Sequence, residues 1–416
     1  MVSKKTLFLM IIPAFLCAAL HAQSPPFRWA SPRSMALGGF TATGFNEPAN
    51  MHTNPASLFE IERFTISTGL AGSLIDGSVE PDGAKRWKTL DKPSLAPNFT
   101  AGINFGARLV SAGISLNTFD TYKIKFPDKA STRYQGTDMT LYSGGLDLAI
   151  GFMPFQDWAF GVKAGLRGSH IQWERKINPF PSSPDPTFDM NWKLKMKSFS
   201  DIDFLGGVLW SPSYRFKTGL TYRPQMRYDL DTKITTELPD IMGGSVISSG
   251  TRNIRIEIPQ EVKIGFHWIA TERIDLYLDA GWTEYSRLKT LIIKADDPSP
   301  PYIPAETTIP SRMKDIWHGH VGIEYMVSGF MTLRTGGFYY TESRIPGYEM
   351  SLIPSTAQRG ITAGLGLDFF EWHLDISAGQ ARYDSAKITG AKFPYPLKAD
   401  TDYSRYFAAI SMTYSF

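Results

Sequence analysis

The sequence predicts an all-β fold: a membrane-spanning antiparallel β-barrel of about 14 strands with an N-terminal plug, or hatch, inside it. Three observations carry this prediction: alternating segments, a regular succession of long and short connections, and a final alternating segment that ends on Phe416. From Trp158 onward, for example, Val162 and its alternate neighbours are apolar, whereas Lys163 and Arg167 on the other parity are charged. Such segments present one face to lipid and the other to a polar lumen.

The connections support a membrane barrel over a soluble sandwich, which would also alternate. Seven long polar stretches take turns with six short ones, and thirteen connections join fourteen strands. Extended outer loops and short periplasmic turns are typical of outer-membrane meanders. The long stretches lie near 72–96, 120–137, 174–188, 231–252, 295–312, 346–357 and 385–402.

The first 22 residues have the pattern of a secretory signal peptide. Lys4 and Lys5 precede an apolar run over 7–20, and small residues at Ala19 and Ala22 offer cleavage points. An uncleaved anchor is the alternative. Cleavage at either point removes Cys17, the one cysteine, so we expect a mature chain without disulfides or thiolate metal sites.

We expect residues 23–60 to form the plug and 61–416 the barrel. Apolar residues between 34 and 58 follow neither a helical nor a strand period, so the segment needs walls around it. Asn54 is placed to cap a short helical turn, with Pro55 at its first position and Ala56 after it. Asn46 and Pro48 indicate a similar turn. A flexible linker is the alternative, because Gly, Asn and Pro also mark loops.

These features together resemble the FadL and TodX family of outer-membrane transporters for long-chain fatty acids and other hydrophobic compounds. The resemblance covers nearly the whole mature chain, and the opening at 35–39 is similar to an uncharacterised spirochaetal branch. The segments that carry it are Asn54-Pro55-Ala56 before the first strand, Trp282-Thr283-Glu284-Tyr285-Ser286, Leu333-Arg334-Thr335-Gly336 and Gly364-Leu365-Gly366.

The resemblance implies an outer-membrane channel for hydrophobic compounds such as long-chain fatty acids, gated by the hatch and opening through a gap in the wall. By analogy, the motif Asn54-Pro55-Ala56 would fix how the hatch enters the first strand. We expect Phe40, Phe45 and Met51 to supply apolar hatch or ligand contacts. An alternative is a barrel of this type that binds proteins at the surface, like the secretion-system carrier PorV, through the patch at 298–303.

Polar residues of the expected lumen allow two interpretations. His318 and His320 lie on one strand face and could share a metal, but polar side chains also fill wide barrels, so we expect no metal. Arg167, Arg215 and Arg334 could attract a carboxylate head group. We favour ordinary ion pairs with lumenal acids. No catalytic carboxylate pair or Gly-x-Ser-x-Gly elbow is present, which indicates no enzyme and no cofactor.

Composition limits the partners. A formal net charge of +3 gives no basic excess for nucleic acid. We expect a hydrophobic small molecule or fatty acid as ligand, outer-membrane lipid around the barrel, and the barrel-insertion machinery as a partner during biogenesis. Closure removes the strand edges that recruit partners, so we expect a monomer in the cell outer membrane.

Overall fold

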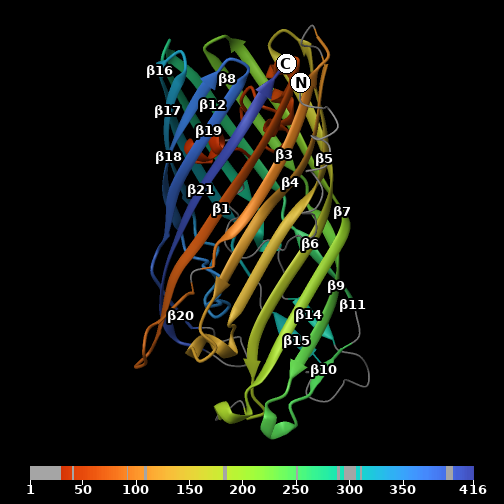
Figure 1. Cartoon of the computed structure of the whole chain (residues 1–416), viewed down its shortest axis with the longest axis vertical. Coiled ribbons are helices and arrows are strands. Elements are labelled where there is room, and N and C mark those ends of the chain that lie inside the picture. The colour runs from red at the N-terminus through yellow and green to blue at the C-terminus, as the bar shows by residue number, and fades with distance from the viewer. Residues whose placement is uncertain are drawn as a thin grey trace, which may run out of the picture.

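The computed structural model is a closed antiparallel barrel, as the alternating segments predict (Figure 1). It closes where β1 (Phe64–Pro81) pairs with β21 (Ala399–Ser415), from Thr65 opposite Ser415 to Pro81 opposite Ala399. The structure describes residues 30–39, 42–90, 92–106, 110–180, 185–249, 252–287, 291–294, 306–309, 312–389 and 397–416. The predicted signal peptide at 1–22 lies outside these residues.

The described part of the chain forms 14 wall segments, as the connections predict, and two of the segments are each split into two strands. The remaining segments after β1 are β3 (Ser94–Asn104), β4 (Val110–Lys125), β5 (Asp138–Phe155), β6 (Trp158–Ile177), β7 (Met190–Ser213), β8 with β9 (Phe216–Arg223, Met226–Glu237), β11 with β12 (Arg252–Ile258, Glu261–Thr271), β13 (Ile274–Thr283), β16 (Ile316–Ser328), β17 (Met331–Tyr340), β18 (Gln358–Phe369), β19 (Trp372–Tyr383) and β21.

Small additional elements decorate the long connections. They are β2 (Trp87–Lys88), β10 (Val246–Ser248), β14 (Leu291–Lys294), β15 (Glu306–Ile309), β20 (Ala386–Ile388) and the 3-10 helices η3 (Ser131–Tyr134), η4 (Pro186–Phe188), η5 (Asp240–Met242) and η6 (Tyr285–Arg287). None of the helices in the described ranges has the length and apolar character needed to cross a bilayer.

The longest strands extend well beyond the membrane. β7 has 24 residues, whereas about 9–11 residues of a tilted strand cross a bilayer. Near the short turns the wall is apolar outside, with Val162 59% and Leu166 51% exposed, and charged inside. Farther along β6 the pattern is inverted: Ile171 and Trp173 are buried inward. The inversion fits a lower barrel surrounded by lipid and an outer barrel surrounded by water.

The N-terminal segment lies inside the barrel, near the end that also holds the C-terminus (red in Figure 1). Its helices are α1 (Pro32–Ala36), η1 (Pro48–His52) and η2 (Pro55–Glu60). Ser31 caps α1 through a bond from the Ser34 amide. α1 packs against β17, β18, β19 and β21, and η2 packs against β5, β6 and β7. We refer to residues 30–61 as the hatch.

Candidate functional site

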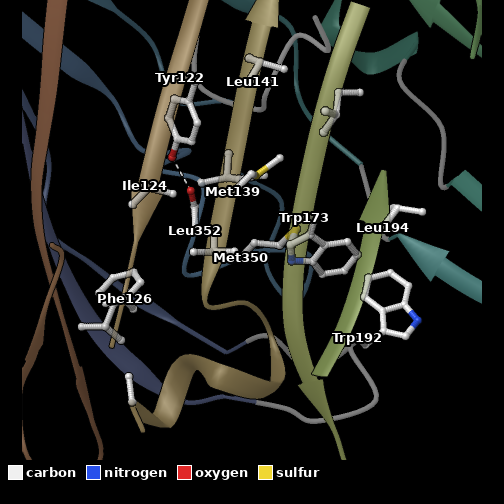
Figure 2. Packing of buried hydrophobic residues seen from close by; sticks show 14 of the residues in the cluster. Tyr122, Ile124, Phe126, Met139, Leu141, Trp173, Trp192, Leu194, Met350 and Leu352 are labelled. Carbon is white, nitrogen blue, oxygen red and sulfur yellow. Dashed lines mark hydrogen bonds between the residues drawn. The ribbon is translucent and has the colours of Figure 1, made fainter. Parts of the chain in front are cut away.

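An apolar cluster occupies the outer half of the barrel, toward the long connections. Trp173 on β6 and Trp192 on β7 meet edge to face, with ring centroids 5.3 Å apart (Figure 2). We name this group the outer apolar cluster. Its wall residues include Ile75, Val79, Tyr122, Ile124, Phe126, Met139, Leu141, Ile171, Trp173, Ile177, Met190, Trp192, Leu194, Met196, Leu230, Ile234, Tyr383 and Tyr403.

The connection 341–357 between β17 and β18 folds into this cluster, and we name it the inserted loop. Met350, Leu352 and Ile353 at its tip are buried among the wall residues. Figure 2 shows Leu352 and Met350 between β4, β5 and β6. An apolar loop tip therefore fills part of the outer barrel.

Two tyrosine hydroxyls hold the inserted loop. Tyr122 on β4 donates to the Leu352 carbonyl oxygen, and Tyr403 on β21 donates to the Ser351 carbonyl oxygen. The Ser351 amide donates to Gln135 Oε1 at 3.2 Å. Because these carbonyl oxygens are buried away from water, the bonds supply the donors that they would otherwise lack.

Buried ion pairs separate the outer apolar cluster from the hatch along β5, β6 and β7. Lys163 Nζ lies 2.7 Å from Asp203 Oδ2 and 3.3 Å from Asp147 Oδ1. Arg167 bonds both aspartates, with Nη2 2.8 Å from Asp147 Oδ1. Arg167 thus forms ion pairs with lumenal acids, the interpretation that the sequence favours. An apolar molecule in the outer cluster therefore faces a charged layer below it.

The Asn54-Pro55-Ala56 turn fixes the hatch to the wall. Asn54 Oδ1 accepts from the Ala56 amide at 3.0 Å, which is the cap that the local sequence predicts. Its Nδ2 donates to the Ala42 carbonyl at 2.6 Å and to the Val208 carbonyl on β7 at 3.2 Å. One buried amide side chain thus joins η2, the preceding hatch segment and the wall.

Glycines in the wall make room for this turn. A Cβ atom on Gly161 of β6 would lie 2.2 Å from the Pro55 carbonyl carbon, and one on Gly207 of β7 would lie 2.0 Å from Asn54 Oδ1. Real Cβ atoms do not approach other heavy atoms so closely, so any side chain here would displace the turn. Close backbone approach explains why these strands carry glycine at these positions.

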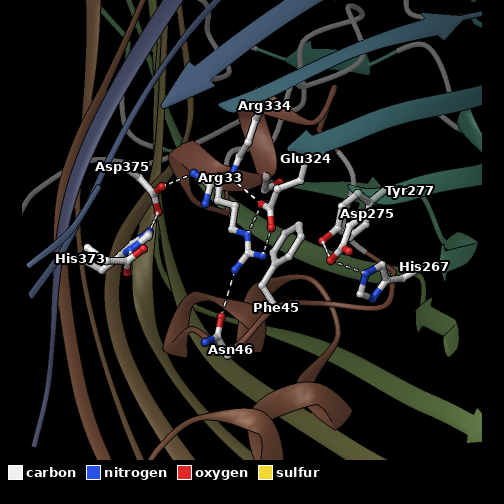
Figure 3. A network of polar contacts seen from close by, with 12 residues as sticks. Arg33, Phe45, Asn46, His267, Asp275, Tyr277, Glu324, Arg334, His373 and Asp375 are labelled. Carbon is white, nitrogen blue, oxygen red and sulfur yellow. Dashed lines mark hydrogen bonds and ion pairs between the residues drawn. The ribbon is translucent and has the colours of Figure 1, made fainter. Parts of the chain in front are cut away.

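A charged network anchors α1 on the opposite side (Figure 3). Arg33 bonds Glu324 of β16 through both carboxylate oxygens, at 2.7 and 2.9 Å, and Asn46 at 3.0 Å. Arg334 on β17 bonds the same Glu324 at 2.5 Å and also Asp375 on β19. Bidentate pairs of this kind fix geometry as well as charge. Arg334 therefore lies in the lumen, engaged with acids.

Two hatch residues have shifted acidities. Burial, together with Asp375, raises the pKa of Glu47, although its 2.5 Å bond from Ser31 opposes the shift. Burial lowers the pKa of His52 to about 3, against the attraction of Asp147, 3.4 Å away. His52 is therefore neutral at neutral pH and contacts Asn117 on β4.

The predicted apolar hatch residues pack against the wall. Phe45 meets Tyr277 edge to face at 5.7 Å between centroids, with the Arg33 guanidinium 4.6 Å above its ring. Met51 is buried with Leu58 and Ala149. Phe40 lies outside the described residues. The contacts of Phe45 and Met51 join hatch to barrel, and their part in ligand binding stays a prediction.

His318 and His320 are buried in the lumen, with His318 Nδ1 2.9 Å from His320 Nε2. His320 Nδ1 donates to the Gly38 carbonyl of the hatch at 2.6 Å. Across the described ranges, no group of three or more His, Cys, Asp or Glu side chains is placed to hold a metal ion. The bond from His320 joins β16 to the hatch.

The expectation for Arg215 is wrong. β8 begins only at Phe216, so Arg215 lies in the exposed short turn before it, where its Nε donates to the Tyr214 hydroxyl at 2.6 Å. The alternation of the sequence continues into this turn, which is why Arg215 was expected in the lumen. The patch at 298–303, proposed for a protein partner, lies outside the described residues.

The wall has a seam between β7 and the segment formed by β8 and β9. Ladder pairs of β7 run with β8 as far as Gly206 opposite Tyr222 and resume with β9 at Lys197 opposite Asp231. Within the described stretch between these pairs, the Asp229 amide donates to the Asp201 side chain at 3.3 Å. We name residues 198–205 and 223–230 the wall seam. It lies level with the charged layer.

Sequence reasoning missed the outer apolar cluster and the inserted loop. A signal was present on β6, where inward residues change from Lys163 and Arg167 to Ile171 and Trp173, while Gln172 faces outward. The loop left only a weak signal, the apolar residues Met350, Leu352 and Ile353 within a polar connection.

Comparisons with known proteins agree with this architecture. Residues 26–416 match the family model described as outer membrane protein transport protein (OMPP1/FadL/TodX). The chain is similar to a Pseudomonas aeruginosa FadL homologue, with 16% identity, a TM-score of 0.81, and coverage of 96% of this chain and 100% of that one. No curated protein matches it significantly.

Two further solved structures are similar. The Pseudomonas putida toluene transporter TodX shares 15% identity with a TM-score of 0.73, over 93% of this chain and 98% of that one. The Ralstonia pickettii toluene transporter TbuX shares 14% identity with a TM-score of 0.70, again over 93% and 98%. Since the family model spans almost all of a closed, hatch-filled barrel, the chain belongs to the OMPP1/FadL/TodX family of outer-membrane transport proteins for hydrophobic compounds.

Proposed function

We propose that this protein takes up long-chain fatty acids and that their acyl chains bind in the outer apolar cluster. The observation that carries the proposal is the length of that cluster. Inward side chains of β7 from Met190 to Met196 form an apolar row roughly 20 Å long, from six residue steps of an extended strand. An extended long acyl chain has a similar length.

A cation lies beside this row. The Arg175 guanidinium carbon lies 4.5 Å from the ring centroid of Trp192 and 5.1 Å from that of Trp173, and the side chain is buried. A guanidinium can bind a carboxylate in bidentate fashion, and apolar surroundings strengthen the interaction. The row and the arginine together suit a fatty acid better than toluene, the compound named for two of the similar transporters.

The cargo would take the place of the inserted loop. The tip residues Met350, Leu352 and Ile353 are buried within the cluster, so an acyl chain bound among them must displace them. The loop would then act as an outer lid that shields the apolar walls from water when no cargo is bound. This exchange conserves buried apolar area and so costs little hydrophobic free energy.

We further propose that the hatch gates the lower barrel and that cargo leaves sideways through the wall seam. A straight path would carry an acyl chain through the buried pairs of Lys163 and Arg167, where breaking an ion pair costs several kcal/mol, about 3–5 by typical measurements. The seam lies at the same level, beside lipid-facing residues such as Phe199 and Ile202. The monomeric state and contact with the insertion machinery stay predictions.

The test uses cells that lack their own fatty-acid transporter and express this chain. We expect uptake of radiolabelled oleate well above that of toluene. The variant Ile171→Asn places an amide in the outer apolar cluster and should reduce oleate uptake by at least tenfold. The matched control Gln172→Asn changes the adjacent outward residue and should retain uptake. Heat-modifiable gel mobility verifies that both variants form barrels.

Equal oleate uptake by the two variants would contradict the proposed binding site. Toluene uptake without oleate uptake would contradict the substrate class while leaving the transporter function intact. Absence of both would refute transport. A second measurement is lipid mass spectrometry of the purified protein and of a variant that lacks residues 34–58. The variant should lose the co-purified fatty acid if the hatch and the binding site form one unit.

A further inference from the structure

A row of lysines covers the outward face of β7 beyond its lipid-facing part. Lys195 and Lys197 are exposed and Lys193 is half-buried, while the intervening Leu194 and Met196 point inward and are buried. The lysines are therefore on the outer surface of the barrel, on the side of the long connections.

Neighbouring strands extend this row. Lys233 on β9 lies directly opposite Lys195 in the ladder, and His170 on β6 lies directly opposite Lys197. Lys233 is exposed, and His170 is half-buried. We name Lys193, Lys195, Lys197, Lys233 and His170 the outer basic patch.

The acids nearby neutralise only part of the patch. Glu174 bonds Lys193, and the exposed Asp231 lies opposite Lys197. Among residues that the structure describes, no acid pairs with Lys195 or with Lys233, the lysine opposite it. Like charges directly opposite on neighbouring strands destabilise a sheet. An anion bound between them would remove that repulsion.

The height of the patch identifies the anion. Two residues below Lys197, about 7 Å along the strand, Phe199 is 58% exposed and begins the apolar belt that faces lipid. Leu166 on β6 marks the same boundary. Because the long connections of such barrels lie on the outer side, the patch is at the level of the outer-leaflet head groups.

We propose that the outer basic patch binds phosphate groups on the head groups of outer-leaflet lipids. One phosphate would bridge Lys195 on β7 and Lys233 on β9, while Lys197 and His170 would extend the site toward β6. The ladder between β7 and β9 resumes at Lys197 after the wall seam. The bound lipid therefore clamps the two strands directly above the seam. This site is separate from the proposed cargo site inside the barrel.

Native mass spectrometry of the detergent-purified full chain tests the proposal, with bisphosphorylated lipid A as the probe. The variant Lys195→Gln, Lys197→Gln, Lys233→Gln should bind the probe about 100-fold more weakly, from roughly fivefold per lysine near an anionic surface. The control Lys85→Gln, Lys88→Gln, Lys314→Gln removes the same charge from exposed positions elsewhere and should bind like the wild type.

The same lipid A without its phosphates should bind the wild type as weakly as the patch variant binds the intact probe. Adding phosphorylated lipid A should also raise the melting temperature of the wild type but not of the patch variant. Equal binding by wild type and patch variant, equal loss in the control, or equal binding of the dephosphorylated lipid would each overturn the proposal. Displacement of the lipid by millimolar inorganic phosphate would assign the site to free phosphate instead.

Discussion

Replacing Tyr122 and Tyr403 by phenylalanine should release the inserted loop from the outer apolar cluster. Each change deletes one hydroxyl that donates to a buried loop carbonyl, Leu352 for Tyr122 and Ser351 for Tyr403. A buried carbonyl without its donor costs about 1–3 kcal/mol, whereas in the released loop it is hydrated. Taking about 1.5 kcal/mol for each bond, the double variant loses about 3 kcal/mol of loop docking.

A loss of this size raises the population of the released loop by about 100-fold, since each 1.4 kcal/mol is a factor of ten. The assay is hydrogen–deuterium exchange of peptides from 341–357, where amide exchange should accelerate by that factor. Tyr406→Phe is the matched control, because its hydroxyl accepts only an exposed bond from Gln380 on the outer surface. It should leave the exchange of the loop unchanged.

Loop release should also change the affinity for cargo. If the loop is a lid that competes with cargo, the double variant should bind oleate more tightly than the wild type, with unchanged barrel formation. Unaltered exchange in 341–357 would show that the tyrosine bonds do not hold the loop. Faster exchange with weaker oleate binding would show that the loop forms part of the cargo site rather than a lid over it.

Three further predictions concern the hatch. Gly207→Ala places a Cβ atom 2.0 Å from Asn54 Oδ1 and should weaken hatch docking by about 1–3 kcal/mol, measured as faster proteolysis of 42–60. The control Gly206→Ala, whose Cβ has its nearest neighbour at 3.9 Å, should leave that proteolysis unchanged. Arg33→Met removes one partner of Glu324 and should loosen α1 by about 1–3 kcal/mol, since Arg334 still pairs with that carboxylate; exchange at 31–37 measures it. His52 has a pKa of about 3 in the docked hatch and its ordinary value near 6.5 when released, so the released form takes up the proton and docking weakens as pH falls from 6.5 toward 3. The raised pKa of Glu47 strengthens docking as pH falls, so the contribution of His52 is the difference in hatch docking between wild type and His52→Gln. That difference should vanish above pH 7. Equal pH profiles for the two proteins would contradict the assignment.

The lower barrel could be predicted from sequence because lipid outside and water inside impose a strict alternation on each strand. The cap by Asn54 could equally be predicted, because it depends on three consecutive residues. The start of the strand near Arg215 could not be predicted, since the residues of the preceding turn continue the alternation of the strand by chance.

The outer half was harder for a physical reason. Inward residues of β7 are Asp201 and Asp203 below the irregularity in its ladder with β6, but Met196 and Leu194 above it, so the parity changes within one strand. A β-bulge causes such a change and leaves no motif. The outer apolar cluster also joins residues more than 200 positions apart, such as Tyr122 and Leu352, and no local pattern reports that contact.

The central claim is that a fatty acid occupies the outer apolar cluster. Photocrosslinking tests it most directly, with a palmitate analogue that carries a diazirine near its methyl end and peptide mass spectrometry to locate the adducts. We predict adducts on Trp173, Trp192 and Leu194, and competition by unlabelled oleate. Adducts confined to the lipid-facing belt, at residues such as Val162 and Phe204, or adducts that oleate does not reduce, would contradict the account.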